Sequence, residues 1–379
     1  KCRATNSDVI LYLYTSSVAV TCGFFSSSCK HCRIIPTSST EGEHLINEPN
    51  VSVSLVANKL PIKDILVVCS SIGSAYTSEK KGTQKKPIES ARLVEEWGIE
   101  GDAHVGKWHR QVSMLSFEKI EAFREKGADV DFGAFGENLV VEGFDLSKVP
   151  VGTKFQIGEA ILELTQIGKE CHSHCAIYKV MGDCIMPREG VFTRVLKGGE
   201  IKAGDEITML PLEKDRPFTA AVITLSDKGA AGEREDKSGP LIQEMLMKEG
   251  YDVIETLLLP DGEQPLKHQL MRLADQRQVN VIFTTGGTGF AERDVTPETT
   301  QAVCDRMAMG IADAIRQYSL SITGRAMLSR AVSGIRKKTL IVNLPGSPKA
   351  VKESLEYVLP HLGHGLGILR GTDGECGNS

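Results

Sequence analysis

The most informative stretch of the sequence is a glycine turn that directly follows an apolar run. The run VNVIFTT leads into the turn, where missing Cβ atoms let successive backbone N–H groups converge on an anion. Threonines beside the glycines add hydroxyl donors, and a helix expected to begin at Thr296 adds the positive end of its dipole. The sequence therefore predicts a phosphate-binding turn made by Thr285, Gly286, Gly287, Thr288 and Gly289.

Two aspartates accompany this turn. Asp294 stands where a P-loop would carry its Lys-Ser/Thr pair, and Asp261 follows another apolar run, in LLLPDG. Carboxylates repel phosphates unless a cation lies between them, and Mg²⁺ is usually bound by one or two carboxylates together with substrate phosphates. Each aspartate taken singly also fits an ordinary turn or cap residue. The two together predict a Mg²⁺ site beside the phosphate-binding turn.

The elements that must position these residues alternate between strands and helices from residue 219 onward. Apolar runs that read as strands are separated by periodic segments that read as helices, such as SGPLIQEMLMKEG, for which Ser238 is the expected cap. Ser347 and Pro348 are expected to start a further helix after the run TLIVNLPG. This order predicts an α/β three-layer domain with a mostly parallel sheet covered on both faces, and ligands beyond the carboxyl ends of its strands.

Three blocks in this part of the chain resemble the signature blocks of the molybdopterin adenylyltransferase family, of the MogA/MoaB type. The resemblance covers about residues 219–376, and the blocks are LSDKGAAGEREDKSG, TTGGTGFAERDVTPE and NLPGSPKAV. It implies a homotrimeric α/β enzyme of molybdenum cofactor biosynthesis that activates molybdopterin with ATP and Mg²⁺. A non-catalytic protein that binds and carries the pterin is the alternative.

The same resemblance assigns roles to individual residues. It implies that Asp261 and Asp294 are the paired catalytic, Mg²⁺-binding aspartates and that the glycine turn binds phosphate. It places Ser347 on the pterin side, and the helix start that contains Ser238 also matches the family. The implied reaction is attack of the pterin's terminal phosphate on the α-phosphate of ATP, with pyrophosphate leaving.

A cluster of cysteines and histidines in residues 168–196 is the second candidate site. The spacing of Cys171, Cys175 and Cys184 fits no common zinc site. Buried, inert thiols are the ordinary interpretation, because free cysteine is often buried. The other interpretation is a reactive thiol whose pKa is lowered by neighbouring cations such as Lys169 and Arg188.

Short β-branched runs between glycine-containing turns predict a β-rich, barrel-like domain around this cluster. Three blocks resemble a MOSC domain over about residues 63–210: IEGDAHVGKWHRQVSMLS, FGENLVVEGFDL and FTRVLKGGEIKAGDEI. The resemblance implies that a cysteine handles sulfur or the molybdenum–dithiolene unit of the cofactor. Cys184 is the preferred candidate for this catalytic cysteine and Cys175 the alternative, while His104, His109 and Arg110 are candidates for holding the cofactor's phosphate. A chain in which only this domain is active, in sulfur transfer or reduction, is a further alternative.

Composition limits the remaining possibilities. The 379 residues carry a net charge of -5, which gives no reason to expect nucleic acid as a partner. The most apolar stretch, residues 9–25, is interrupted by Ser and Thr and falls short of the roughly 20 residues that span a membrane, so no membrane is expected. Ten cysteines in so long a chain are too few for a disulfide scaffold, and we expect a reducing, cytoplasmic location.

We therefore expect four segments and one ligand class. Residues 1–62 match neither family and stay unassigned, 63–210 form the MOSC-like domain, 211–218 a linker, and 219–379 the molybdopterin-binding adenylyltransferase domain. Molybdopterin and ATP are the expected small-molecule partners, and other molybdenum cofactor enzymes are candidate protein partners.

Overall fold

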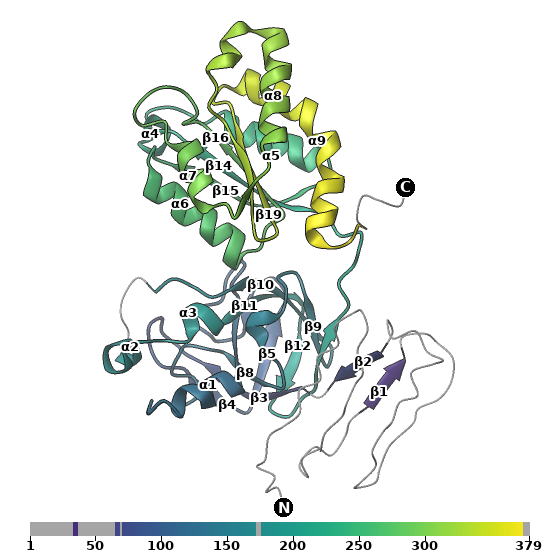
Figure 1. Ribbon diagram of the computed structural model, residues 1–379. Coiled ribbons are helices and arrows are strands. Elements are labelled where there is room, and N and C mark those ends of the chain that lie inside the picture. The colour runs from purple at the N-terminus through teal and green to yellow at the C-terminus, as the bar shows by residue number, and fades with distance from the viewer. Residues whose placement is uncertain (1–32, 37–64, 69, 172–175, 374–379) are drawn as a thin grey trace, which may run out of the picture. The chain divides into compact units, whose positions relative to one another are not determined.

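The computed structural model describes residues 33–36, 65–68, 70–171 and 176–373, and the chain divides into two compact units, Lys1–Pro211 and Leu212–Ser379 (Figure 1). Most of the unassigned segment, the apolar stretch 9–25 included, lies outside the described residues. β1 (Arg33–Pro36) lies within that segment and pairs antiparallel with β2 (Ile65–Val68), which follows it. No helix among the described residues combines the length and the apolar character needed to cross a membrane.

The first unit is β-rich, as expected. Its main sheet has eight strands in the order β13-β9-β10-β11-β7-β8-β3-β4. An isolated bridge between Ser71 and Glu206 links the beginnings of β3 and β13, whereas closure of the whole sheet into a barrel stays a prediction. The strands are β3 (Ser71–Thr77), β4 (Lys86–Ile88), β7 (Val112–Ser116), β8 (Leu139–Glu142), β9 (Lys154–Ile157), β10 (Ala160–Ile167), β11 (Val191–Lys197) and β13 (Ile207–Leu210).

Alternating burial of side chains along a strand shows which face of this sheet packs on the core. Along β10, Leu162 and Leu164 are buried while Ile161 and Glu163 are partly exposed, so one face of the strand packs on the core. A second, three-stranded sheet has the order β12-β5-β6 and packs on the same core. The remaining elements of this unit are β5 (Ser90–Val94), β6 (Gly98–Ile99), β12 (Gly199–Lys202), α1 (Phe117–Arg124), η2 (Leu146–Lys148), α2 (Ala176–Met181) and α3 (Met186–Glu189).

The second unit is built on a mixed six-stranded sheet. The strand order is β15-β14-β16-β19-β18-β17, in which the first four strands are parallel and the last two antiparallel. The strands are β14 (Thr219–Leu225), β15 (Asp252–Leu259), β16 (Val281–Thr285), β17 (Arg306–Met307), β18 (Ser333–Arg336) and β19 (Thr339–Leu344).

Helices cover both faces of this sheet. Along β14, Val222 packs with α5, α8 and α9 on one face, and Ile223 packs with α6 and α7 on the other, an arrangement that can be followed in Figure 1. A strand that is buried on both faces reads as a continuous apolar run, which is why TAAVITL shows no alternation. The helices are α4 (Asp227–Ala230), α5 (Ser238–Lys248), α6 (Glu263–Met271), η3 (Arg272–Gln276), α7 (Thr296–Val303), α8 (Met309–Ile322), η4 (Gly324–Leu328) and α9 (Pro348–Arg370).

Part of the predicted linker packs on the second unit. The Arg370 guanidinium, near the end of α9, lies 4.1 Å from the ring centroid of Phe218 and donates hydrogen bonds to the carbonyl oxygens of Arg216 and Pro217. Residues 216–218 are thereby fixed to the C-terminal helix and belong to the second unit.

Parallel register brings the predicted site residues to one edge of this sheet. Leu225 pairs with Leu259, and Thr285 pairs with both Thr224 and Leu344, so the four parallel strands end level with one another. The glycine turn, Asp261 and Ser347 all follow these ends, at the edge where open α/β sheets bind ligands.

Candidate functional site

The glycine turn after β16 has a backbone that only glycine adopts easily. Gly286 and Gly287 have φ values of 99° and 63°, in the left-handed region. A Cβ atom on Gly286 would collide with the carbonyl oxygen of Leu225, and one on Gly287 would collide with the hydroxyl of Thr296. The turn is therefore packed between the end of β14 and the start of α7, with no room for a side chain.

The hydroxyls around the turn have structural partners. Thr285 donates from Oγ1 to the carbonyl oxygen of Pro345 at 2.6 Å, and Ser238 donates from Oγ to that of Gly346 at 3.0 Å. The side chains of Thr285, Thr288 and Ser238 are all buried. These two hydroxyls therefore tie neighbouring loops together, and cofactor binding by Thr285 and Ser238 stays a prediction.

The two helix starts at this edge differ from each other. Ser238 is the first residue of α5 and not its cap, because Asp236 accepts the N–H groups of Ser238 and Gly239 through Oδ1 at 2.9 and 3.0 Å. Ser347 does cap α9, accepting the N–H of Ala350, and its side chain is exposed. Ser347 is therefore accessible to a ligand, while its place on the pterin side stays a prediction.

Asp261 is held by a neighbouring strand end. Its Oδ2 accepts the N–H of Asp227 at 3.1 Å, and its own N–H donates to Oδ1 of Asp227 at 2.9 Å. This reciprocal pair joins the exits of β15 and β14. Asp227 is not predicted as a site residue from the sequence. It nevertheless ends the apolar run TAAVITLSD in the same way that Asp261 follows the run LLLP.

Asp294 lies in the loop between the glycine turn and α7. Its Oδ2 accepts the N–H of Ala291 at 2.9 Å, which closes a tight turn. The preceding residue, Arg293, extends across to Asp261, with Nε 4.0 Å from Oδ2. The Arg293 side chain is 68% exposed and the Asp261 side chain 12% exposed, so the cation covers a carboxylate that is otherwise largely enclosed.

The donor set of the two aspartates suits a Mg²⁺ ion that enters with a nucleotide. Among the described residues, each of the two carboxylates uses Oδ2 for its hydrogen bonds, and no donor contacts Oδ1. The described residues contain no group of three or more His, Cys, Asp or Glu side chains that could hold a metal ion. Mg²⁺ is commonly bound by only one or two protein carboxylates when substrate phosphates supply its other ligands.

In the first unit, the predicted catalytic cysteine is enclosed. Cys184 is 5% exposed and packs in an apolar cluster with Phe123 and Phe135. Cys171, which follows the end of β10, is exposed. The alternative candidate, Cys175, lies outside the described residues. A thiol that reacts with a ligand needs access, which the structure gives to Cys171 and not to Cys184.

His104 is held by a buried ion pair. Its Nδ1 lies 3.2 Å from Oδ1 of Asp102, whose Oδ2 accepts from Nζ of Lys85 at 2.8 Å. Burial by itself raises the pKa of the Asp102 carboxyl, but hydrogen bonds from His104 and Lys85 outweigh that effect and hold the pKa below its usual range. Burial likewise lowers the pKa of Lys85, against the raising effect of Asp102. Neither Lys85 nor Asp102 is predicted as a site residue from the sequence.

The positively charged side chains of Arg110 and Lys169 both lie near the aromatic ring of Phe192. The Arg110 guanidinium lies 5.6 Å from the ring centroid of Phe192 and 4.7 Å from that of Trp108, and Nζ of Lys169 lies 5.9 Å from Phe192. His109 contacts Oε1 of Gln166 through Nε2 at 2.9 Å. The structure therefore brings predicted Arg110 together with Lys169, two residues before the exposed Cys171.

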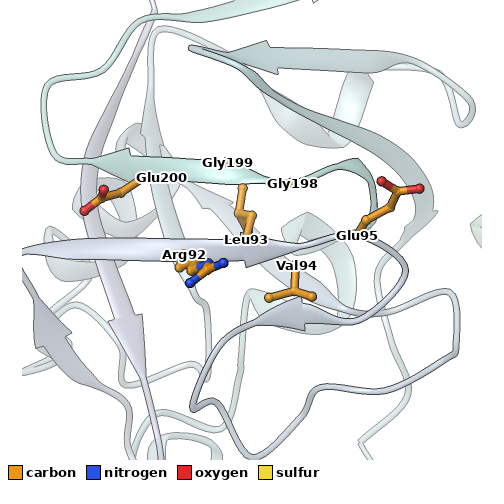
Figure 2. Close-up of a pocket in the computed structure, with 7 residues that line it drawn as sticks. All are labelled: Arg92, Leu93, Val94, Glu95, Gly198, Gly199 and Glu200. Atoms are coloured by element: carbon orange, nitrogen blue, oxygen red, sulfur yellow. The ribbon is translucent and has the colours of Figure 1, made fainter.

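A hollow of about 460 Å³ on the first unit is separate from all of these residues. Its lining comes from β5 and from the turn into β12, as Figure 2 shows, and contains none of the predicted site residues. The lining residues are Arg92, Leu93, Val94, Glu95, Gly198, Gly199 and Glu200.

A β-rich unit with a cysteine and a cationic cluster is followed by an α/β unit with a glycine turn and two aspartates at one sheet edge, so the protein has two modules. Residues 101–208 match the model of the MOSC domain, and residues 221–364 match that of a probable molybdopterin binding domain. Both matches fall within the segments for which the sequence analysis found these resemblances.

Individual proteins are similar to part of this chain. The molybdopterin adenylyltransferase of Helicobacter pylori is 39% identical over 153 residues, which cover 40% of this chain and 87% of the relative. That of Escherichia coli K12 is 42% identical over 140 residues, covering 36% and 71%. The crystal structure of the molybdopterin biosynthesis enzyme MoaB from Thermus thermophilus aligns at 45% identity over 41% of this chain and 97% of its own, with a TM-score of 0.39. The chain belongs to the molybdopterin adenylyltransferase family and carries a MOSC domain in addition.

Proposed function

We propose that the second unit transfers the adenylyl group of ATP to the terminal phosphate of molybdopterin. The observation that carries the proposal is the meeting, at one sheet edge, of a glycine turn with a left-handed backbone and two aspartates whose hydrogen bonds leave Oδ1 free. In the reaction, a phosphate oxygen of the pterin forms a bond to the α-phosphorus of ATP, the bond to the β-phosphate breaks, and pyrophosphate leaves.

Each residue contributes position or charge, and none forms a covalent intermediate. The backbone N–H groups of the turn hold phosphate oxygens. Asp261 and Asp294 would hold Mg²⁺, which would supply positive charge to neutralise the phosphates. Arg293, exposed beside Asp261, supplies a further positive charge on the same side. Ser347, at the start of α9, faces the pterin.

The first unit binds the same ligand class in this proposal. Arg110 and Lys169 offer two cations, with the exposed thiol of Cys171 two residues beyond Lys169. Cations suit the phosphate of the cofactor, and a thiolate suits its sulfur or molybdenum end. Cys171 takes the role in which the sequence favoured Cys184, because its thiol is exposed.

Assembly into a homotrimer through the second unit is part of the proposal. Large apolar side chains are exposed along α8 and η4, among them Leu320, Ile322 and Met327. An apolar surface of this kind is typical of contacts between subunits.

Pyrophosphate release tests the catalytic proposal against the carrier alternative. The full chain is incubated with ATP and Mg²⁺, with and without molybdopterin. The proposal expects pyrophosphate only when the pterin and Mg²⁺ are both present. A protein that binds molybdopterin tightly but releases no pyrophosphate would be a carrier.

A further inference from the structure

Arg330 lies between η4 and β18, and it spans the loop that connects the glycine turn to Asp294. Its Nε donates to the carbonyl oxygen of Gly289 at 2.7 Å, and its Nη2 donates to the carbonyl oxygen of Asp294. Its backbone N–H donates to the carbonyl oxygen of Thr288 at 3.1 Å. One residue, distant in sequence, thus holds both ends of this loop.

The third guanidinium nitrogen extends this connection to the following helix. Nη1 of Arg330 pairs with Oε1 of Glu298 in the first turn of α7. A guanidinium presents its donors in one rigid plane, so its bonds fix the spacing of the loop ends and the helix together. A lysine ammonium has no such planar set of donors.

The segment that carries Arg330 is itself anchored on both sides. Arg316 of α8 donates from Nε to the carbonyl oxygen of Ser329 at 3.1 Å and from Nη2 to that of Ala331 at 2.8 Å. The position of Arg330 is therefore set by packing within the second unit, before any ligand binds.

The Asp294 carboxylate belongs to the same loop whose backbone carbonyl oxygens accept hydrogen bonds from Arg330. Oδ2 of Asp294 lies 2.8 Å from the position that a Cβ atom of Gly289 would occupy, so carboxylate and glycine are closely packed. The carbonyl oxygens of these same two residues accept the Nε and Nη2 bonds of the arginine. We propose that Arg330 is a positioning residue that fixes the loop so that Oδ1 of Asp294 faces the metal and phosphates. The inference rests on the proposed function of this unit.

Turnover measurements on Arg330→Ala and Arg330→Lys test this role. We expect kcat for pyrophosphate release to fall by ~10²-fold in Arg330→Ala, since a misplacement of about 1 Å has that effect. The KM for ATP should change by less than about threefold, because the N–H groups of the turn are unaltered. Arg330→Lys should recover only part of the loss.

Two controls separate positioning from general stability. Arg336, which pairs with Asp275 and the carbonyl oxygen of Val303, is an arginine of the same unit outside this loop, so Arg336→Ala should lower stability and leave kcat unchanged. Glu298→Gln removes the negative charge of the exposed partner of Arg330 and leaves the arginine's bonds to the loop, so this variant should also leave kcat unchanged. An equal fall of kcat in Arg336→Ala would make Arg330 merely structural and overturn the inference.

A double-mutant cycle tests whether Arg330 acts through Asp294. In an Asp294→Asn background, adding Arg330→Ala should lower kcat by less than about threefold more. Binding of Mn²⁺ in the presence of ATP, followed by electron paramagnetic resonance, gives the same cycle without turnover. Arg330→Ala and Asp294→Asn should each weaken Mn²⁺ binding, and the combination should weaken it no further. Independent effects would overturn the inference, whereas a wild-type protein that binds Mn²⁺ with ATP but releases no pyrophosphate would contradict only the proposed function.

Discussion

At the scale of single residues, the charge of Asp261 and Asp294 is the feature on which the proposed reaction depends. Asparagine keeps the size of each side chain and retains an oxygen for the N–H groups of Asp227 and Ala291, so both variants should fold. We expect Asp261→Asn and Asp294→Asn each to slow pyrophosphate release by at least ~10²-fold, the scale of losing one well-placed polar group in a transition state. The double variant should be little slower than either single variant, because both act through one ion.

Gly287→Ala provides the contrast. A methyl group there meets the hydroxyl of Thr296 and requires a left-handed backbone, so the turn itself should change and ATP binding should weaken. Normal turnover in both asparagine variants would mean that the aspartates hold no catalytic metal.

The reactivity of the thiols follows from their exposure. Cys171 is exposed, Cys184 is buried in an apolar cluster, and burial raises the pKa of the Cys304 thiol to about 11. With iodoacetamide at pH 8, we expect Cys171 to be alkylated before Cys184 and Cys304, because only an accessible thiolate reacts quickly. Peptide mass spectrometry identifies the modified residue, and Cys171→Ser is the control. Faster labelling of Cys184 would restore it as the candidate of the first unit.

At the scale of elements, the buried pair of Lys85 and Asp102 connects β4 to the segment that carries His104. Replacing one partner of a buried pair leaves an uncompensated charge, so Lys85→Met should lower the free energy of unfolding by about 3–5 kcal/mol. Lys119, which pairs with Asp145 and Glu189 in the same unit, is 31% exposed, and Lys119→Met should cost about 1 kcal/mol or less.

Urea unfolding followed by tryptophan fluorescence measures this difference. Both tryptophans of the chain, Trp97 and Trp108, lie in the first unit, so the signal reports on that unit alone. Equal losses of stability in the two methionine variants would show that the Lys85 pair is not energetically distinct.

The elements that the sequence predicts best are the long, strongly patterned ones. The runs VNVIFTT and TLIVNLPG become the buried strands β16 and β19, because a strand covered on both faces must be apolar throughout. Helix α9, whose start the sequence predicts at Ser347 and Pro348, continues through Pro360 to Arg370, because Leu362 and Leu366 keep its buried face.

Other elements carry too little local signal to be predicted. β17 has only two residues, and β18 contains a glycine and an arginine, so neither shows a period. The partners of the site residues are also distant in sequence. Arg330 lies 36 positions from Asp294 and Lys85 lies 17 from Asp102, and only the tertiary fold brings them together.

At the scale of the whole molecule, two units with different folds are joined in one chain and share one proposed ligand class. The glycine turn and aspartates belong to the second unit, and the exposed thiol and its neighbouring cations belong to the first. Adenylyl transfer should therefore survive alkylation of Cys171, since none of its proposed groups is a cysteine. Loss of pyrophosphate release on alkylation of that thiol would contradict this division of roles.

The central claim is that this chain forms adenylylated molybdopterin, and mass spectrometry of the small molecules after one turnover tests it most directly. The full chain is mixed with molybdopterin, ATP and Mg²⁺, and the same mixture is prepared with Asp294→Asn and with EDTA in place of Mg²⁺. We expect molybdopterin carrying one added adenylyl group, with an equal amount of pyrophosphate, in the first mixture only. Recovery of unmodified molybdopterin from the wild-type protein, with ATP intact, would contradict the claim.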